Sequence, residues 1–242
     1  MTPERHFDVI AHVQTDFHEK FGVPRQSGLG AKLTGLIVFT PRYRVADALR
    51  GIEEFSHLWL IWDFSLVPNQ ERFEPLVRPP RLGGNERRGV FATRSPFRPN
   101  PIGLSLVRLE QVLETENGPA LLISGIDVMD GTPVYDIKPY LPHIESVPDA
   151  RGGFALEHAS DRLTVRCPEE LIKMIPENKR EALLEALSLD PRPAYQEDPD
   201  RLYGFGFAGT DVRFTVKEDT LTVREIIPYP GKDGPGVSKE LK

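Results

Sequence analysis

The sequence has little cysteine and no long apolar run. Cys167 is the single cysteine among 242 residues, so no disulfide can form within the chain, and we expect a reducing compartment, the cytoplasm. The longest apolar patch, residues 58–62, has the length of a strand, and the first ten residues lack the apolar core of a signal peptide. The sequence therefore predicts no membrane-spanning segment.

The common signatures of nucleotide, metal and nucleophile sites are also missing. The segment GLG at 28–30 could begin a dinucleotide fingerprint, but Leu33 stands where the third glycine belongs, and no GxxxxGK[ST] occurs. The six histidines have no metal-ligand spacing and no cysteine pair accompanies them, so we predict no metal site. Ser105 lacks the second glycine of a nucleophile elbow, and a lone cysteine is more often a small core residue than a nucleophile.

Lysine is absent from residues 72–108, although this stretch holds eight arginines and only two acidic residues. Its net charge is therefore +6, while the whole chain carries −6, which leaves −12 for the remainder. Arginine without lysine favours bidentate recognition of phosphate or carboxylate, so the stretch predicts a local anionic ligand. The alternative is that these arginines only solvate a surface loop.

Prolines stiffen the centre of this stretch, GVFATRSPFRPNPIGLSLVRL at 89–109. Proline at positions 96, 99 and 101 fixes backbone dihedrals and keeps the preceding residue out of the helical region. We expect a rigid loop that presents Arg94, Arg98 and Asn100, between a buried strand over 90–92 and a second strand over 102–109.

The remaining pattern consists of short strands separated by glycine and proline turns, without the long amphipathic helices of a doubly wound sheet. Within the first 150 residues, strands are expected at 7–13, 36–39, 57–64, 121–126 and 134–140, and helical spacing at 46–55. We therefore predict a mainly β protein with a closed barrel.

The character of the sequence changes near residues 147–153. Beyond them we expect a short strand at 162–167, a helix over 168–189 that Pro176 breaks or kinks, and strands at 202–207 and 212–226, the last a hairpin. The predicted domains are a β-barrel at 1–150 and a smaller α+β domain at 151–242.

Five segments of the chain resemble a known family. They are VPRQSGL (23–29), FSHLW (55–59), RPPRLGGNERRGVFATRSPFRPNPIGLS (78–105), DGTPVYDIKPYLP (130–142) and DPRPAY (190–195). They are similar to the bacterial enzymes that methylate N6 of threonylcarbamoyladenosine beside the anticodon of tRNA, and the resemblance spans essentially the whole chain.

This resemblance implies a β-barrel methyltransferase outside the Rossmann type, which uses S-adenosylmethionine and works as a homodimer with the cofactor near the subunit interface. An arginine for the carboxylate, an apolar wall for the adenine and aromatic faces for the sulfonium would suit this cofactor. The cofactor contacts implied by the matching segments are Pro24, Arg25, Gln26, Phe64, Ser65, Arg94, Leu104, Asp130, Gly131, Thr132 and Pro133.

The implied reaction needs help at the acceptor nitrogen, because N6 of this nucleoside is both an aryl amine and a urea nitrogen and is a poor nucleophile. A carboxylate or tyrosinate that accepts its proton is the natural catalyst. We predict Asp136 in this role with Tyr135 beside it, and Lys138 and Tyr140 as positioning groups that contact the substrate. The alternative for Asp136 is a structural ion pair with Lys138, on the same strand face.

The predicted tRNA contacts centre on the rigid loop. Arg98 suits the threonyl carboxylate or a phosphate, and Asn100 suits a base edge, although hydrogen bonds inside the loop are a competing role for Asn100. A wider phosphate-binding surface is predicted to include Arg78, Arg81, Arg87, Arg88, Arg192 and Tyr195.

Two other function classes remain open from the residues alone. The arginine-rich stretch could belong to a non-catalytic RNA- or nucleotide-binding module, which would bind RNA in a salt-dependent manner without moving a methyl group. A hydrolase would need Ser105 or Cys167 as its nucleophile.

Overall fold

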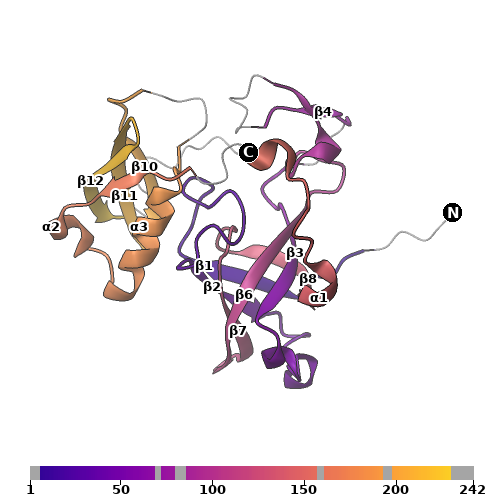
Figure 1. Ribbon diagram of the computed structural model, residues 1–242. Helices are drawn as coiled ribbons and strands as arrows, with labels where there is room; N and C mark the ends of the chain where they lie inside the picture. Colours follow the sequence, from indigo (N-terminus) through magenta and orange to yellow (C-terminus); the bar gives the residue numbers. More distant parts are fainter. Residues whose placement is uncertain (1–5, 69–71, 80–85, 157–160, 193–197, 230–242) are drawn as a thin grey trace.

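The computed structural model describes residues 6–68, 72–79, 86–156, 161–192 and 198–229. Two bodies lie side by side, a barrel drawn in indigo to pink and a sheet with helices drawn in orange and yellow (Figure 1). Arg81 and Tyr195, which we predicted for the tRNA surface, lie outside the described residues.

The barrel is closed, with antiparallel neighbours in the order β1-β2-β7-β6-β3-β8. Its interior alternates with its exterior along each strand, as in β3, where Leu58, Leu60 and Trp62 are buried. This confirms the predicted mainly β architecture with a barrel. The strands are β1 (Ala11–Thr15), β2 (Thr34–Phe39), β3 (His57–Asp63), β6 (Ile102–Thr115), β7 (Gly118–Ser124) and β8 (Thr132–Pro139).

Short elements connect the barrel strands or follow the last of them, β8. A small hairpin pairs β4 (Leu76–Val77) with β5 (Arg88–Gly89), and the helical turns are η1 (Ala46–Leu49), η2 (Ile52–Glu54), η4 (Val90–Ala92), α1 (Pro142–Glu145) and η5 (Gly153–Leu156).

Three of our expectations for these segments were wrong. The first strand begins at Ala11, later than position 7. The helical spacing at 46–55 gives two short 3-10 turns, because Gly51 between them has φ 86°. Residues 90–92 form a 3-10 turn in place of a buried strand, because the amide and hydroxyl of Thr93 both donate to the carbonyl of Val90.

The C-terminal part, residues 161–229, is a sheet in the order β10-β11-β12-β9 with two helices packed against it. The expected helix over 168–189 is broken at Pro176, whose missing amide cannot continue it. The boundary at 150/151 stays a prediction. The elements are β9 (Thr164–Arg166), α2 (Glu169–Ile172), η6 (Glu177–Lys179), α3 (Arg180–Ser188), β10 (Tyr203–Phe207), β11 (Thr210–Lys217) and β12 (Thr220–Pro228).

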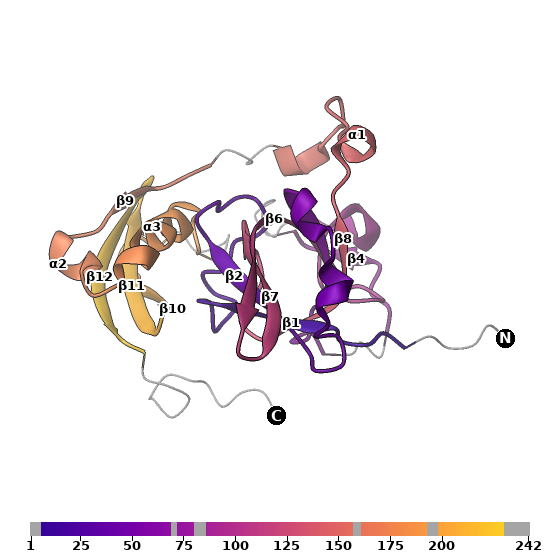
Figure 2. The same cartoon turned by 90° about the horizontal axis from the view of Figure 1, so that it is seen from below.

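The two parts share one hydrophobic core through residues 16–33, which we call the β1–β2 loop. This indigo segment lies between the barrel and the orange sheet (Figure 2). Phe17 packs edge-on against Phe207 with ring centroids 5.4 Å apart, and Lys179 forms an ion pair with Asp16 at 2.6 Å. The β1–β2 loop is therefore a structural junction between the two sheets.

Candidate functional site

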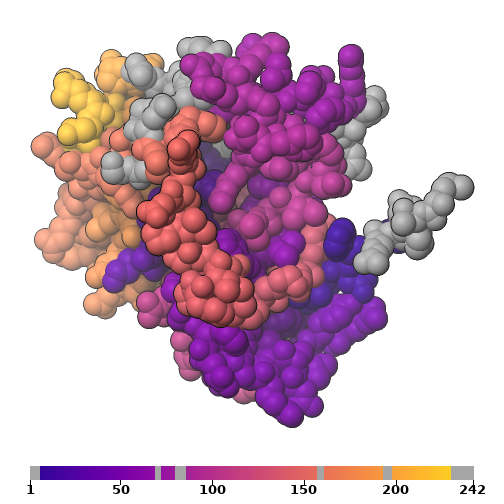
Figure 3. Space-filling view, turned by 45° about the vertical axis from the view of Figure 1, so that its right-hand side comes forward, coloured from indigo at the N-terminus to yellow at the C-terminus, as the bar shows by residue number. Residues whose placement is uncertain are grey.

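A pocket of about 1150 Å³ opens where β3 ends and β6 begins. Five segments line it: residues from 20–26 of the β1–β2 loop, 62–67 at the end of β3, 91–100, 102–104, and 127–132 before and into β8. The purple residues of the arginine-rich stretch border a recess on the face drawn in Figure 3. Ligand sites often occupy such mouths of β-barrels.

Residues 90–101, which we call the arginine loop, are held by their own hydrogen bonds. The Ser95 amide donates to Thr93 Oγ1 at 3.2 Å, and Arg98 Nη1 donates to the Thr93 carbonyl at 3.2 Å. The Asn100 carbonyl accepts from the Ile102 amide at 2.8 Å, which leads the chain into β6. The rigid loop that the prolines predict is therefore present, and Arg98 and Asn100 both line the pocket.

Arg94 joins this loop to the β1–β2 loop. Its Nη1 donates to Gln26 Oε1 at 2.7 Å, and both side chains line the pocket. Ser27 and Gly28 then tie the same segment to the barrel, because the Leu106 amide donates to Ser27 Oγ at 3.1 Å and the Gly28 amide donates to the Gly125 carbonyl at 2.8 Å.

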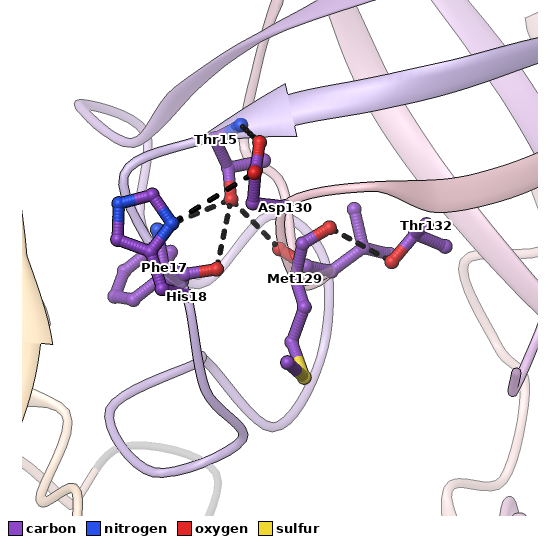
Figure 4. A network of polar contacts seen from close by, with 7 residues as sticks. Thr15, Phe17, His18, Met129, Asp130 and Thr132 are labelled. Atoms are coloured by element: carbon purple, nitrogen blue, oxygen red, sulfur yellow. Dashed lines mark hydrogen bonds and ion pairs between the residues drawn. The ribbon is translucent and has the colours of Figure 1, made fainter. Parts of the chain in front are cut away.

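The turn before β8 contributes a further part of the pocket lining. Asp130 Oδ1 accepts from the Thr15 amide at 3.1 Å, and Thr132 Oγ1 donates to the Met129 carbonyl at 2.8 Å (Figure 4). Gly131 has φ 77°, a conformation that glycine adopts without strain. These bonds hold the Asp130–Thr132 turn against the end of β1.

A chain of polar side chains joins the pocket lining to the interior of the barrel, and the sequence reasoning missed its acidic member. Trp62 Nε1 donates to Ser105 Oγ at 2.8 Å, and Ser105 Oγ donates to Asp127 Oδ1 at 2.5 Å. Asp127 lines the pocket. Burial raises the pKa of Asp127 from 3.8 to about 6, although the bond from Ser105 and the charge of Arg94 act in the opposite direction. Asp127 follows an apolar run that is typical of a buried strand, so no sequence signal identified it as a site residue.

Glycine at position 103 is what lets Trp62 lie against β6. A Cβ there would come within 2.1 Å of the indole. The Trp62 ring is 4.3 Å from that of Phe64 between centroids, so the two aromatics form one apolar wall of the pocket.

The structure gathers most of the residues implied for the cofactor. Pro133 is the member of that set that does not line the pocket, although it directly follows Thr132, which does. The members that line it are Pro24, Arg25, Gln26, Phe64, Ser65, Arg94, Leu104, Asp130, Gly131 and Thr132.

The predicted catalytic residues lie beside the pocket and do not line it. Asp136 Oδ2 forms an ion pair with Lys138 Nζ at 2.9 Å, the alternative contact that the sequence left open. Tyr135 lies close to Asp63, which does line the pocket; burial and the Asp63 charge raise the pKa of Tyr135. Tyr135 therefore stays protonated at neutral pH. The catalytic roles of both residues stay predictions.

Lys138 and Tyr140 stand toward the other end of β3. Lys138 pairs with Trp59, and the Tyr140 amide donates to the His57 carbonyl at 3.0 Å. His57 and Asp63 are at opposite ends of β3, roughly 20 Å apart at about 3.3 Å per residue. A contact of Tyr140 with tRNA would therefore be remote from the pocket, whereas the side chain of Lys138 reaches back to Asp136.

The predicted phosphate contacts on the small hairpin also lie outside the pocket lining. Arg87 is exposed, and Arg88 pairs with Glu86 at 2.6 Å while its guanidinium lies 6.0 Å from the centre of the Phe154 ring. Both remain predicted tRNA contacts.

The two candidate nucleophiles of a hydrolase are poorly suited to that role. Ser105 is 1% exposed and hydrogen-bonded to Trp62 and Asp127, with no histidine along the described pocket lining. Burial and the nearby Glu170 raise the pKa of the Cys167 thiol, which favours the unreactive protonated form. In the portion of the chain that is described, no group of three or more His, Cys, Asp or Glu side chains could hold a metal ion, and no helix has the length and apolar content to cross a membrane.

The pocket fits S-adenosylmethionine chemically. Arg94 and Arg25 offer guanidinium groups for a carboxylate, Trp62 and Phe64 offer aromatic faces, and Asp127 and Asp130 offer carboxylates for an ammonium or a ribose. Its volume is ample for a ligand of that size.

Two family models match the chain: the tRNA-methyltransferase O N-terminal domain over residues 12–146 and the C-terminal domain over residues 160–229. The class defined by the fold and the site is thus the β-barrel methyltransferase, as expected. The chain belongs to the tRNA-methyltransferase O family.

Relatives and a solved structure agree with this membership. The chain is 42% identical to a tRNA (adenine(37)-N6)-methyltransferase of Escherichia coli, over 92% of this chain and 97% of the relative. It is 41% identical, over 90% and 95%, to a Pseudomonas aeruginosa protein whose provisional name is S-adenosylmethionine-dependent methyltransferase. A crystal structure of TrmO from P. aeruginosa superposes with TM-score 0.75 at 33% identity, over 95% of this chain and 99% of that one.

Proposed function

We propose that the protein transfers the methyl group of S-adenosylmethionine to N6 of threonylcarbamoyladenosine at position 37 of tRNA, forming N6-methyl-threonylcarbamoyladenosine. The observation that carries the proposal is that one pocket is lined both by ten of the eleven residues implied for the cofactor and by Arg98 and Asn100. The names of the relatives support the cofactor and the tRNA position.

Each side of the pocket has a separate task in this proposal. When bound, S-adenosylmethionine supplies an activated methyl group on a sulfonium. Arg94 would hold its carboxylate, and Trp62 with Phe64 would exclude water around it. Arg98 would bind the threonyl carboxylate or a phosphate, and Asn100 would bind a base edge, so both partners are oriented together.

A proton must also leave N6. We propose that the Asp63 carboxylate, which lines the pocket, accepts this proton, and that the neighbouring Tyr135 orients Asp63. Asp136 remains a second proposed acceptor, which would have to release Lys138 first.

Nucleoside mass spectrometry tests the reaction. tRNA with and without threonylcarbamoyladenosine is incubated with protein and S-adenosylmethionine, and we expect methylation of the modified substrate alone. Methylation of plain adenosine would contradict the substrate, and RNA binding without any methyl transfer would favour the non-catalytic module. We expect the activity in the cytoplasm, where tRNA is modified.

We also propose a homodimer that meets near the pocket mouth. Apolar side chains that line the pocket are exposed there, with Phe97 51% and Leu104 48% exposed, and a second subunit would cover them. Sedimentation equilibrium with and without S-adenosylmethionine tests this, and a fully active monomer would contradict it.

A further inference from the structure

The turn after α3, residues 190–192, is held by hydrogen bonds between its own residues. Asp190 has φ 51° and follows the last helical turn, with its amide donating to the Leu187 carbonyl at 3.3 Å. Arg192 binds the Asp190 carboxylate through two nitrogens, Nε and Nη2, each at 2.9 Å. The Arg192 side chain is only 16% exposed, so its guanidinium is occupied in shaping this turn.

Two backbone carbonyls of this turn accept hydrogen bonds from the side chain of Arg25, which belongs to the β1–β2 loop. Arg25 Nη2 donates to the Arg192 carbonyl at 2.9 Å and, more weakly, to the Asp190 carbonyl at 3.5 Å. Arg25 also lines the pocket, so one side chain joins the C-terminal part to the pocket wall.

The contact continues toward the arginine loop. Gln26 Nε2 donates to the Arg25 carbonyl at 2.6 Å, and Gln26 Oε1 accepts from Arg94 at 2.7 Å. The barrel secures the neighbouring Ser27 and Gly28, whereas Arg25 is secured from the C-terminal side. Pro24 has no amide with which to form a further bond.

We propose that the Asp190–Arg192 turn positions the cofactor-binding loop: the C-terminal part sets the geometry of Arg25, Gln26 and Arg94, although none of its described residues lines the pocket. The identity of the ligand rests on the proposed function. In this arrangement Arg192 supports the pocket, in contrast to its predicted place on the tRNA surface.

Two substitutions in the full-length protein test the turn. Asp190→Gly retains the left-handed backbone but removes the carboxylate, and Arg192→Lys retains the charge but loses the two-nitrogen contact. The matched control is Arg213→Lys, which disturbs a similar pair with Asp211 in β11. Affinity for S-adenosylmethionine is measured by calorimetry without RNA, and affinity for a tRNA anticodon stem-loop by fluorescence anisotropy without cofactor.

We expect both turn variants to bind S-adenosylmethionine roughly 5- to 30-fold more weakly, a usual range for coupling between sites, with unchanged RNA affinity and an unaffected control. Weaker RNA binding with normal cofactor binding would overturn the proposal and make the turn an RNA contact. Unchanged affinity for both ligands would also overturn it. A wild-type protein that fails to bind S-adenosylmethionine at all would instead reject the proposed function.

A double-mutant cycle separates positioning from general damage to the fold. If the turn acts through Arg25, Asp190→Gly causes no further loss of cofactor affinity in an Arg25→Ala background. Additive losses would mean that the turn affects the pocket by another route, and the proposal would fail.

Discussion

The barrel and the C-terminal part use their interiors differently. Within the described residues, the buried polar side chains Ser105, Ser124 and Thr132 all belong to the barrel, and every residue that lines the pocket lies between 20 and 132. The C-terminal sheet instead buries aromatic side chains, among them Phe205, Phe207 and Phe214. The barrel therefore buries polar groups, which is costly unless they are hydrogen-bonded, while the C-terminal part contributes apolar packing.

The β1–β2 loop contacts both the C-terminal sheet and the pocket. One end inserts Phe17 and Phe21 among the aromatic rings of the C-terminal sheet, and the other end presents Gln26 to Arg94. This arrangement makes the comparison testable, because substitutions can be directed at either side of one loop.

The largest expected effects come from substituting two glycines. Gly103 lies in the barrel, and Gly22 packs against the C-terminal sheet. Ala at position 103 would place a Cβ 2.1 Å from Trp62, and Ala at position 22 would place one 2.3 Å from the fully buried Phe205, with φ 94° as well. Each substitution is expected to lower the free energy of unfolding by about 3 kcal/mol, through overpacking and, at position 22, backbone strain. Urea denaturation measures it.

Gly209→Ala is the control for this pair. Its φ is 77°, but no atom lies within 4 Å of the added Cβ, so a loss of only about 1 kcal/mol is expected. Of the three, only Gly103→Ala should also abolish cofactor binding at temperatures where the protein is folded. Equal destabilisation by all three would contradict the importance of the two close packing contacts.

The pH dependence of stability should reflect the buried carboxyl in the barrel. Asp127 has a pKa of about 6 in the folded protein against an ordinary 3.8, so the folded state binds more protons between these values. The free energy of unfolding therefore falls as pH rises from about 4 to about 6, by on the order of 2–3 kcal/mol, and is constant above.

Asp127→Asn should remove that slope, whereas Asp47→Asn, at an exposed site, should retain it. Urea midpoints measured at several pH values between 4 and 7.5 give the comparison. The same slope in wild type and Asp127→Asn would show that another group is responsible.

Substitutions in the arginine loop should distinguish cofactor binding from tRNA binding. Arg94→Ala is expected to weaken S-adenosylmethionine binding by about 2 kcal/mol, or roughly 30-fold, because a charge-assisted contact is lost. Arg98→Ala should chiefly weaken tRNA binding. Calorimetry for the cofactor and anisotropy for the RNA measure the two effects, and equal losses of both ligands in both variants would mean that the loop had collapsed.

The exposed pair on β8 should have the smallest effect on stability. Asp136 and Lys138 have side chains 46% and 62% exposed, so Asp136→Asn should change the free energy of unfolding by less than about 1 kcal/mol. Lys138→Met is the matched control. If kcat falls more than tenfold in Asp136→Asn but not in Lys138→Met, Asp136 is the proton acceptor; similar, small changes in both would leave it a structural ion pair.

The strands and the arginine loop could be predicted because their signals are local. A continuous aromatic and apolar run within residues 57–64 marked β3, and three prolines marked the loop that carries Arg94 and Arg98. Residues 90–92 were misread as a strand because a short apolar run is common to several conformations, and the hydrogen bonds from Thr93 decide among them.

By itself, the sequence indicated the mainly β architecture and the residues of the arginine loop, since periodicity and proline act over a few neighbouring residues, and the resemblance of five segments indicated the family. Only the tertiary structure decided that Asp127 lines the pocket, that Asp136 pairs with Lys138, and that Arg25 donates a hydrogen bond to the Arg192 carbonyl, 167 residues away. Burial and pairing depend on contacts between distant segments, and closure of the barrel and its junction with the C-terminal sheet create those contacts.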